Sequence, residues 1–176
     1  MENALHIIAI WAHILGIALF VGPQFFLAFA WVPAARLIED QRVRASLTRT
    51  LVRRFGWIGG AGLALTIRAG GYLIGTWRSS YSYPADAGFT EIRYGVLFII
   101  KMNVLIIMLI VVGLHTFAVG PRLVTAIENE VNGLGTAEAT RKARAASMVF
   151  SIAGLALALT IMVLGVMMNT TDFSFK

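Results

Sequence analysis

A lysine, a methionine, a histidine and an arginine follow one another at intervals of seven residues along one largely apolar stretch. They are Lys101, Met108, His115 and Arg122. Residues seven apart drift only slowly around a helix, so the four side chains share one face. The stretch is long enough to cross a bilayer, where a central lysine costs about 2.5 to 3.5 kcal/mol on insertion scales. Such a residue is retained when a cavity, a partner or a ligand receives it.

The composition places the chain among membrane proteins. Of its 176 residues 58% are hydrophobic and only 14% are charged, whereas soluble domains are roughly 45 to 50% apolar. The net charge of +6 comes mainly from arginines between the apolar stretches, so it indicates topology rather than nucleic-acid binding. The chain has no cysteine, which excludes disulfides, thiolate metal sites and covalent c-type haem. A redox cofactor would need His, Met, Lys or backbone ligands.

Four apolar stretches predict an all-α polytopic membrane protein, an antiparallel four-helix bundle that forms a single domain over residues 1–176. The spans cover about residues 5–32, 55–77, 94–119 and 147–168. Basic residues concentrate in the first and third connections, so these are expected on the cytoplasmic side and both termini outside. We expect multi-pass insertion in a bacterial inner membrane. The basic connections should continue as helices, with Thr136 as the N-cap of the last one.

Small residues predict where the helices approach one another. The second span has a ladder of Gly56, Gly60 and Ala64. The fourth span has a similar face, formed by Ser147, Ser151, Gly154 and Ala158. Such faces let helix backbones come close in lipid, and Asn103 is expected to hydrogen-bond between helices. No internal repeat is evident.

The antiparallel order of the spans predicts a cluster of polar and sulfur-bearing side chains in the outer half of the bundle. Its members are His6, His13, Arg68, Lys101, Met162, Met167 and Met168. The two histidines are seven residues apart, about 10 Å along one helix face. His115 lies toward the cytoplasmic end of the third span, near Arg122, and is expected to belong to a second level of the bundle.

Three interpretations of the outer cluster compete. In a b-type haem pocket, His6 or His13 would be one axial ligand, and a methionine or a second histidine would be the other, while Arg68 and Lys101 would neutralise the propionates. In a copper site, the two histidines and the outer methionines would suit the soft cuprous ion. In the third interpretation the cations snorkel to the interface and the methionines only fill the core.

Parts of three spans resemble a known group of membrane proteins. The first span, LHIIAIWAHILGIALFVGP, resembles the opening helix of the copper-resistance protein D group, which is also similar to the HemJ-type protoporphyrinogen oxidases. The stretch RRFGWIGGAGLALTIRAGGYLIG is similar to their second helix, and KMNVLIIMLIVVGLHTFAVGPRL to their third, with its Lys, His and Pro-Arg-Leu.

This resemblance implies functional roles for five residues: His6, Gly16, Lys101, His115 and Arg122. It also implies either copper handling or a haem-associated oxidation of a porphyrinogen. The chain departs from the HemJ pattern, because His13 stands where a Trp is expected and GPQFFLAFAWVP replaces a Phe-Pro-Arg-Leu-Phe-like segment. These departures argue against porphyrinogen oxidation.

The leading functional interpretation is an integral membrane, haem-b-binding redox or haem-handling protein. The alternatives are a copper-handling protein of transport or resistance, and a non-catalytic subunit of a respiratory or photosynthetic membrane complex. Candidate partners are the lipid bilayer, a quinone or porphyrin, and further copies of the chain or a larger electron-transfer complex. No glycine-rich phosphate loop follows a strand, so nothing indicates nucleotide binding.

Overall fold

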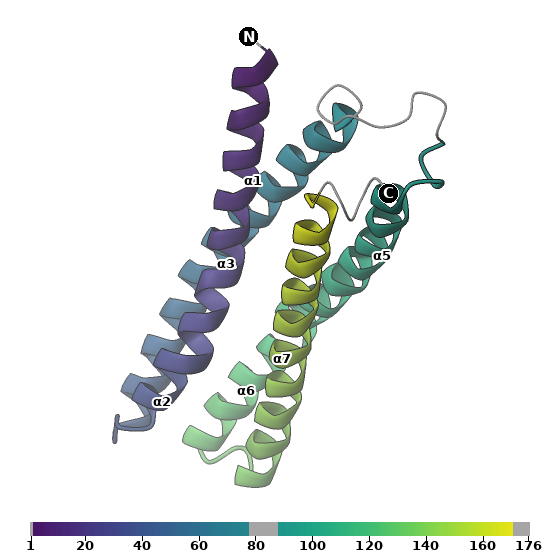
Figure 1. Ribbon diagram of the computed structural model, residues 1–176. Coiled ribbons are helices and arrows are strands. Elements are labelled where there is room, and N and C mark those ends of the chain that lie inside the picture. Colours follow the sequence, from purple (N-terminus) through teal and green to yellow (C-terminus); the bar gives the residue numbers. More distant parts are fainter. Residues whose placement is uncertain (1, 78–87, 171–176) are drawn as a thin grey trace. The chain divides into compact units, whose positions relative to one another are not determined.

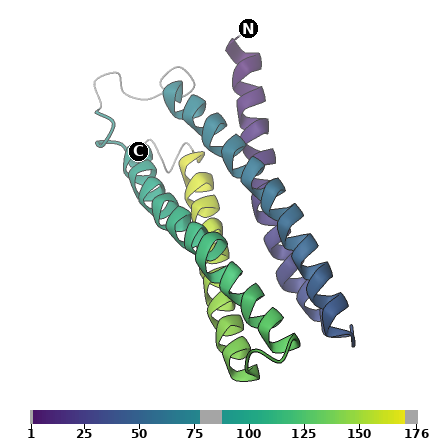
Figure 2. The ribbon, with the colours of Figure 1, turned by 180° about the vertical axis from the view of Figure 1, so that it is seen from behind.

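The protein is described by a computed structural model over residues 2–77 and 88–170, and every regular element within these ranges is a helix. The chain divides into two compact units, Met1–Ser82 and Tyr83–Lys176. Each unit is a hairpin of two long helices (Figures 1 and 2). Residues 78–87 of the second predicted connection lie outside the described ranges. The single transmembrane domain stays a prediction.

The first hairpin consists of α1 (Glu2–Phe25), η1 (Phe26–Trp31), α2 (Val32–Ala35) and α3 (Gln41–Gly75). The carboxylate of Asp40 caps α3 by accepting from the backbone N–H groups of Arg42 at 2.7 Å and Val43 at 3.2 Å. Such a cap satisfies donors that have no partner within the helix. The first basic connection is therefore helical from Gln41 onward, as the sequence predicts.

A close approach of two glycines holds α1 against α3. A Cβ atom on Gly62 would lie 2.7 Å from the carbonyl oxygen of Gly16 and 2.9 Å from the backbone nitrogen of Phe20. Only glycine allows this backbone-to-backbone contact. The predicted ladder of the second span is not the face that contacts α1, because Gly56, Gly60 and Ala64 are exposed in this unit.

The second hairpin consists of α5 (Arg93–Leu114), η2 (His115–Val119), α6 (Gly120–Val131) and α7 (Ala137–Met168). The hydroxyl of Thr136 accepts from the N–H of Ala139 at 3.2 Å, which confirms the predicted N-cap. Asn103 does not connect two helices, because its side-chain amide donates to the carbonyl of Ile99 on its own helix at 2.9 Å.

The α5 helix, which carries the first part of the predicted polar face, packs against α7. Met108 is 2% exposed, and a Cβ atom on Gly154 of α7 would lie 3.5 Å from Val112. Ala158, on the predicted small-residue face, is 4% exposed. The buried side of this hairpin therefore includes Met108 of the predicted polar face and Gly154 and Ala158 of the predicted small-residue face.

Within the described ranges, three helical segments are long and apolar enough to cross a membrane: Ala4–Ala35, Arg93–Val131 and Ala137–Met168. They correspond to the first, third and fourth predicted spans and identify the chain as a membrane protein. The α3 helix is not among them, because its glycines and Arg68 lower the mean hydropathy of its apolar half.

The two hairpins share a local repeat that the sequence analysis missed. The first long helical segment of each hairpin contains the pattern Phe-Ala-x-x-Pro, at residues 29–33 and 117–121. Each pattern overlaps a π-helical segment that ends two residues before the proline. The bonds that close the two segments are equivalent, since Val32 N–H donates to the Leu27 carbonyl and Gly120 N–H to the His115 carbonyl. Such π turns are rare and are frequent at functional sites.

Candidate functional site

His13 of α1 is fixed by a backbone carbonyl of α3. Its Nδ1 lies 2.9 Å from the carbonyl oxygen of Thr66. A carbonyl can only accept, so Nδ1 carries the proton and the neutral ring has its lone pair on Nε2. The Thr66 hydroxyl donates to the Gly62 carbonyl at 2.9 Å, within α3. The tautomer of His13 is therefore set by the fold.

Gly70 makes room for the His13 ring on the α3 side. A Cβ atom at this position would lie 3.1 Å from Cε1 and 3.3 Å from Nδ1 of the imidazole. Any larger residue would press on the ring and shift it. A hydrogen bond and a small residue of the neighbouring helix thus help to orient the imidazole.

Lys101 of α5 has a similar setting in the second hairpin. Its Nζ lies 3.6 Å from the position that a Cβ atom on Gly165 of α7 would occupy. The side chain is half-buried. Among the described residues no carboxylate lies within ion-pair distance of this ammonium group. The charge is thus held over a glycine without a counter-ion.

His13 and Lys101 occupy equivalent positions of the two hairpins. Each lies twenty residues before the proline of the Phe-Ala-x-x-Pro pattern, from 13 to 33 and from 101 to 121. Each side chain also packs over a glycine of the second long helix in its hairpin. The imidazole of His13 and the ammonium group of Lys101 therefore occupy the same position relative to the repeat in their own hairpins.

The first hairpin also contains the other two residues of the predicted outer cluster. Arg68 is exposed, although its neighbour Ala69 is only 8% exposed. His6 is half-buried near the start of α1. The structure brings His13 to Thr66 and Gly70, and it does not bring Arg68 into that contact.

The methionines of α7 differ in their surroundings. Met168 is 7% exposed, whereas Met162 is 39% exposed; Met167 is half-buried. Positions 162 and 167 are about 140° apart around a helix of 3.6 residues per turn. The three thioethers therefore do not form one face. Within the described residues no three His, Cys, Asp or Glu side chains gather as a metal site would need.

His115 lies at a separate level of the second hairpin, as the sequence predicts. Its Nε2 is 3.1 Å from the Ser147 hydroxyl oxygen and 3.3 Å from that of Ser151, one turn further along α7. It is fourteen residues from Lys101, about 21 Å along the helix. The two side chains thus contact opposite ends of α7.

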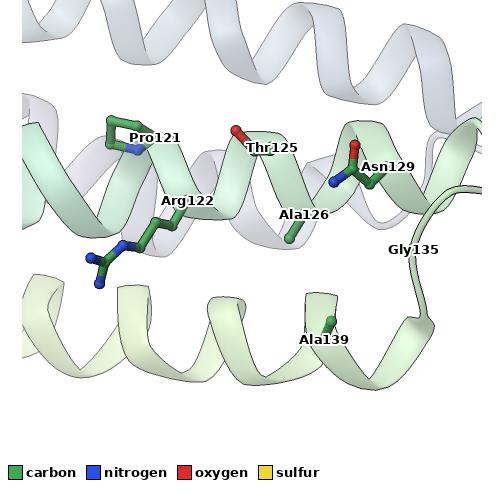
Figure 3. A pocket seen from close by; sticks show the side chains of 7 residues that line it. All are labelled: Pro121, Arg122, Thr125, Ala126, Asn129, Gly135 and Ala139. Carbon is green, nitrogen blue, oxygen red and sulfur yellow. The ribbon is translucent and has the colours of Figure 1, made fainter.

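Arg122 lines a pocket at the junction of α6 and α7 (Figure 3). The pocket has a volume of about 410 Å³, and it is lined by Pro121, Arg122, Thr125, Ala126, Asn129, Gly135 and Ala139. The guanidinium of Arg122 points in a different direction from the polar groups of Thr125 and Asn129 (Figure 3). The polar groups do not converge, and Arg122 makes no contact with His115 in the described hydrogen bonds.

No protein-family model, curated protein or solved structure matches this chain. The helices and the side chains described above define a helical membrane protein with an oriented histidine in one hairpin and, at the equivalent place of the other, a lysine that has no carboxylate partner among the described residues.

Proposed function

We propose that the chain is an integral membrane protein that binds haem b and serves a redox or haem-handling role, in keeping with its resemblance to the copper-resistance protein D and HemJ-like group. The observation that carries the proposal is the hydrogen bond from His13 Nδ1–H to the Thr66 carbonyl. Histidines that bind a metal almost always donate their other ring N–H to a carbonyl or carboxylate, which fixes the ring and raises its basicity. His13 has this arrangement.

The donor set around His13 suits haem better than copper. The chain has no thiolate, and the outer methionines differ in exposure and face, so a preformed His and Met cage for a cuprous ion has little support. A haem iron needs one or two axial ligands, and His13 would be one of them. Bound haem would supply one-electron chemistry.

Lys101 would pair with a ligand carboxylate in the second hairpin. Its ammonium group has no counter-ion among the described residues and lies at the position equivalent to His13 in the other hairpin. An uncompensated cation in an apolar span is expensive and marks a functional site by default. A dianionic porphyrin would compensate it, and exposed Arg68 is the second candidate for this role.

We further propose that α3 also crosses the membrane, as the second predicted span, and that both termini face outward from a bacterial inner membrane. Its apolar half has the length to cross, and the arginine-rich half precedes it on the predicted cytoplasmic side. Because the chain has no cysteine, single cysteines report topology cleanly. Leu134→Cys is expected to react with an impermeant maleimide only in opened cells, and Asn169→Cys in intact cells. The reverse pattern would overturn this orientation.

The role of His13 as a ligand is tested by substitution with glycine. His13→Gly is expected to lower the haem content of the purified protein at least tenfold, because a main axial bond is lost. Millimolar imidazole should restore the Soret absorption, since the small ring can occupy the space left over Gly70. Ile14→Gly, at an exposed position of the same helix, serves as the matched control. Wild-type haem content in His13→Gly would exclude His13 as a ligand.

A further inference from the structure

The hydrogen bonds of His115 differ in kind from those of His13. His13 faces a carbonyl, which only accepts and therefore locks one tautomer. His115 Nε2 faces two hydroxyls, at 3.1 Å and 3.3 Å. A serine hydroxyl can donate or accept. Either tautomer of His115 is therefore compatible with the fold, and the ring can exchange donor for acceptor at both nitrogens.

This arrangement uses only one of the two ring nitrogens of His115. Nε2 has both contacts, and within the described residues Nδ1 has no hydrogen-bond partner. His115 is half-buried and Ser151 is exposed, so the cluster reaches the surface of its hairpin. Nδ1 is the atom to which an outside group would bind.

The chemistry around His115 selects a neutral ligand that can either accept or donate. The cluster consists of an imidazole and two hydroxyls and holds no carboxylate or cation. A phosphate or carboxylate head group would need a cation, and an ester carbonyl of a lipid only accepts. A quinone accepts through its carbonyl oxygens, and the corresponding quinol donates through its hydroxyls. A site that reverses its hydrogen-bond polarity suits both forms.

We propose that His115, Ser147 and Ser151 form a binding site for the head group of a membrane quinone. In the oxidised state Nδ1–H donates to a quinone carbonyl, while a serine hydroxyl donates to Nε2. In the reduced state Nδ1 accepts from a quinol hydroxyl, while Nε2–H donates to a serine. The site lies seven residues before Arg122, toward the predicted cytoplasmic end of the span, and its proposal does not depend on haem at His13.

The experiment measures equilibrium binding of a radiolabelled short-chain ubiquinone analogue to the full chain in nanodiscs made of quinone-free lipid. Wild type is expected to bind above the partition of the analogue into empty nanodiscs, in both redox forms. His115→Leu and the double variant Ser147→Ala/Ser151→Ala should each weaken binding about tenfold, the equivalent of one or two hydrogen bonds. Thermal unfolding establishes that each variant is folded.

Thr160→Val is the matched control, because this threonine lies on the same α7 helix and its hydroxyl donates only to the Ala156 carbonyl of that helix. Its affinity should equal that of wild type. His13→Gly should also keep quinone affinity, which separates this site from the proposed haem. Wild-type binding no greater than that of empty nanodiscs, or unchanged affinity in His115→Leu, would overturn the proposal.

Discussion

Replacing Gly62 by valine is expected to force apart the two helices of the first hairpin and to lower the free energy of unfolding by about 1–3 kcal/mol, the usual range for overpacking. The new side chain would meet the Gly16 carbonyl, where even its Cβ atom would lie at 2.7 Å, and the backbone nitrogen of Phe20 at 2.9 Å. Backbone atoms cannot rotate away as a side chain can. The helices must therefore shift.

Gly60→Val is the control for this prediction. Gly60 is on the same helix, and a Cβ atom there would meet nothing within 4 Å in its hairpin. A change at such a position is expected to stay within about 0.5 kcal/mol. Thermal unfolding of both variants in the same detergent gives the comparison. Equal midpoints for Gly62→Val and wild type would show that this crossing does not hold the hairpin together.

Replacing Lys101 by methionine is expected to stabilise the haem-free protein and weaken its hold on haem. The ammonium group is half-buried without a counter-ion among the described residues, so its removal should raise the unfolding free energy by about 1 kcal/mol or more. For a chain of this size this is a rise of roughly 2–4 °C in Tm. Losing the partner of a propionate should lower haem affinity about tenfold, the value of one charge-assisted hydrogen bond.

Asn103→Leu separates the two effects of the Lys101 substitution. Asn103 is exposed on α5, and its amide donates to its own helix, so its replacement also removes a polar group from the span but touches no proposed ligand. It should leave haem affinity unchanged. A Lys101→Met protein that is less stable than wild type, or that binds haem equally well, would contradict the assigned role.

The face of the third span was predictable because heptad spacing fixes which side chains share a helix face. Lys101 and His115 contact α7 as that spacing requires, and Met108 between them is buried. The partners of these residues were not predictable, since they depend on the rotation and height of α7. The serine pair opposite His115 belonged to a small-residue face that could be read from the sequence, but its meeting with the imidazole could not.

The second predicted span shows why a small-residue pattern can mislead. Its small residues satisfy the spacing on two faces, one through Gly56, Gly60 and Ala64 and another through Gly62, Thr66 and Gly70. Spacing alone cannot choose between them, and the structure places Gly62 against α1. The Phe-Ala-x-x-Pro repeat, in contrast, was present in the sequence. A comparison of the two halves would have found it and aligned His13 with Lys101.

The central claim is that the fold holds an imidazole ready for haem, and an absorption spectrum of the purified wild-type protein tests it most directly. After expression with ample haem, the oxidised protein is expected to show a Soret band, and dithionite should shift this band and produce the visible absorption of a reduced b-type haem. Haem should be bound in a fixed ratio to protein. A purified, folded protein that shows no Soret band before or after haem is added would contradict the claim.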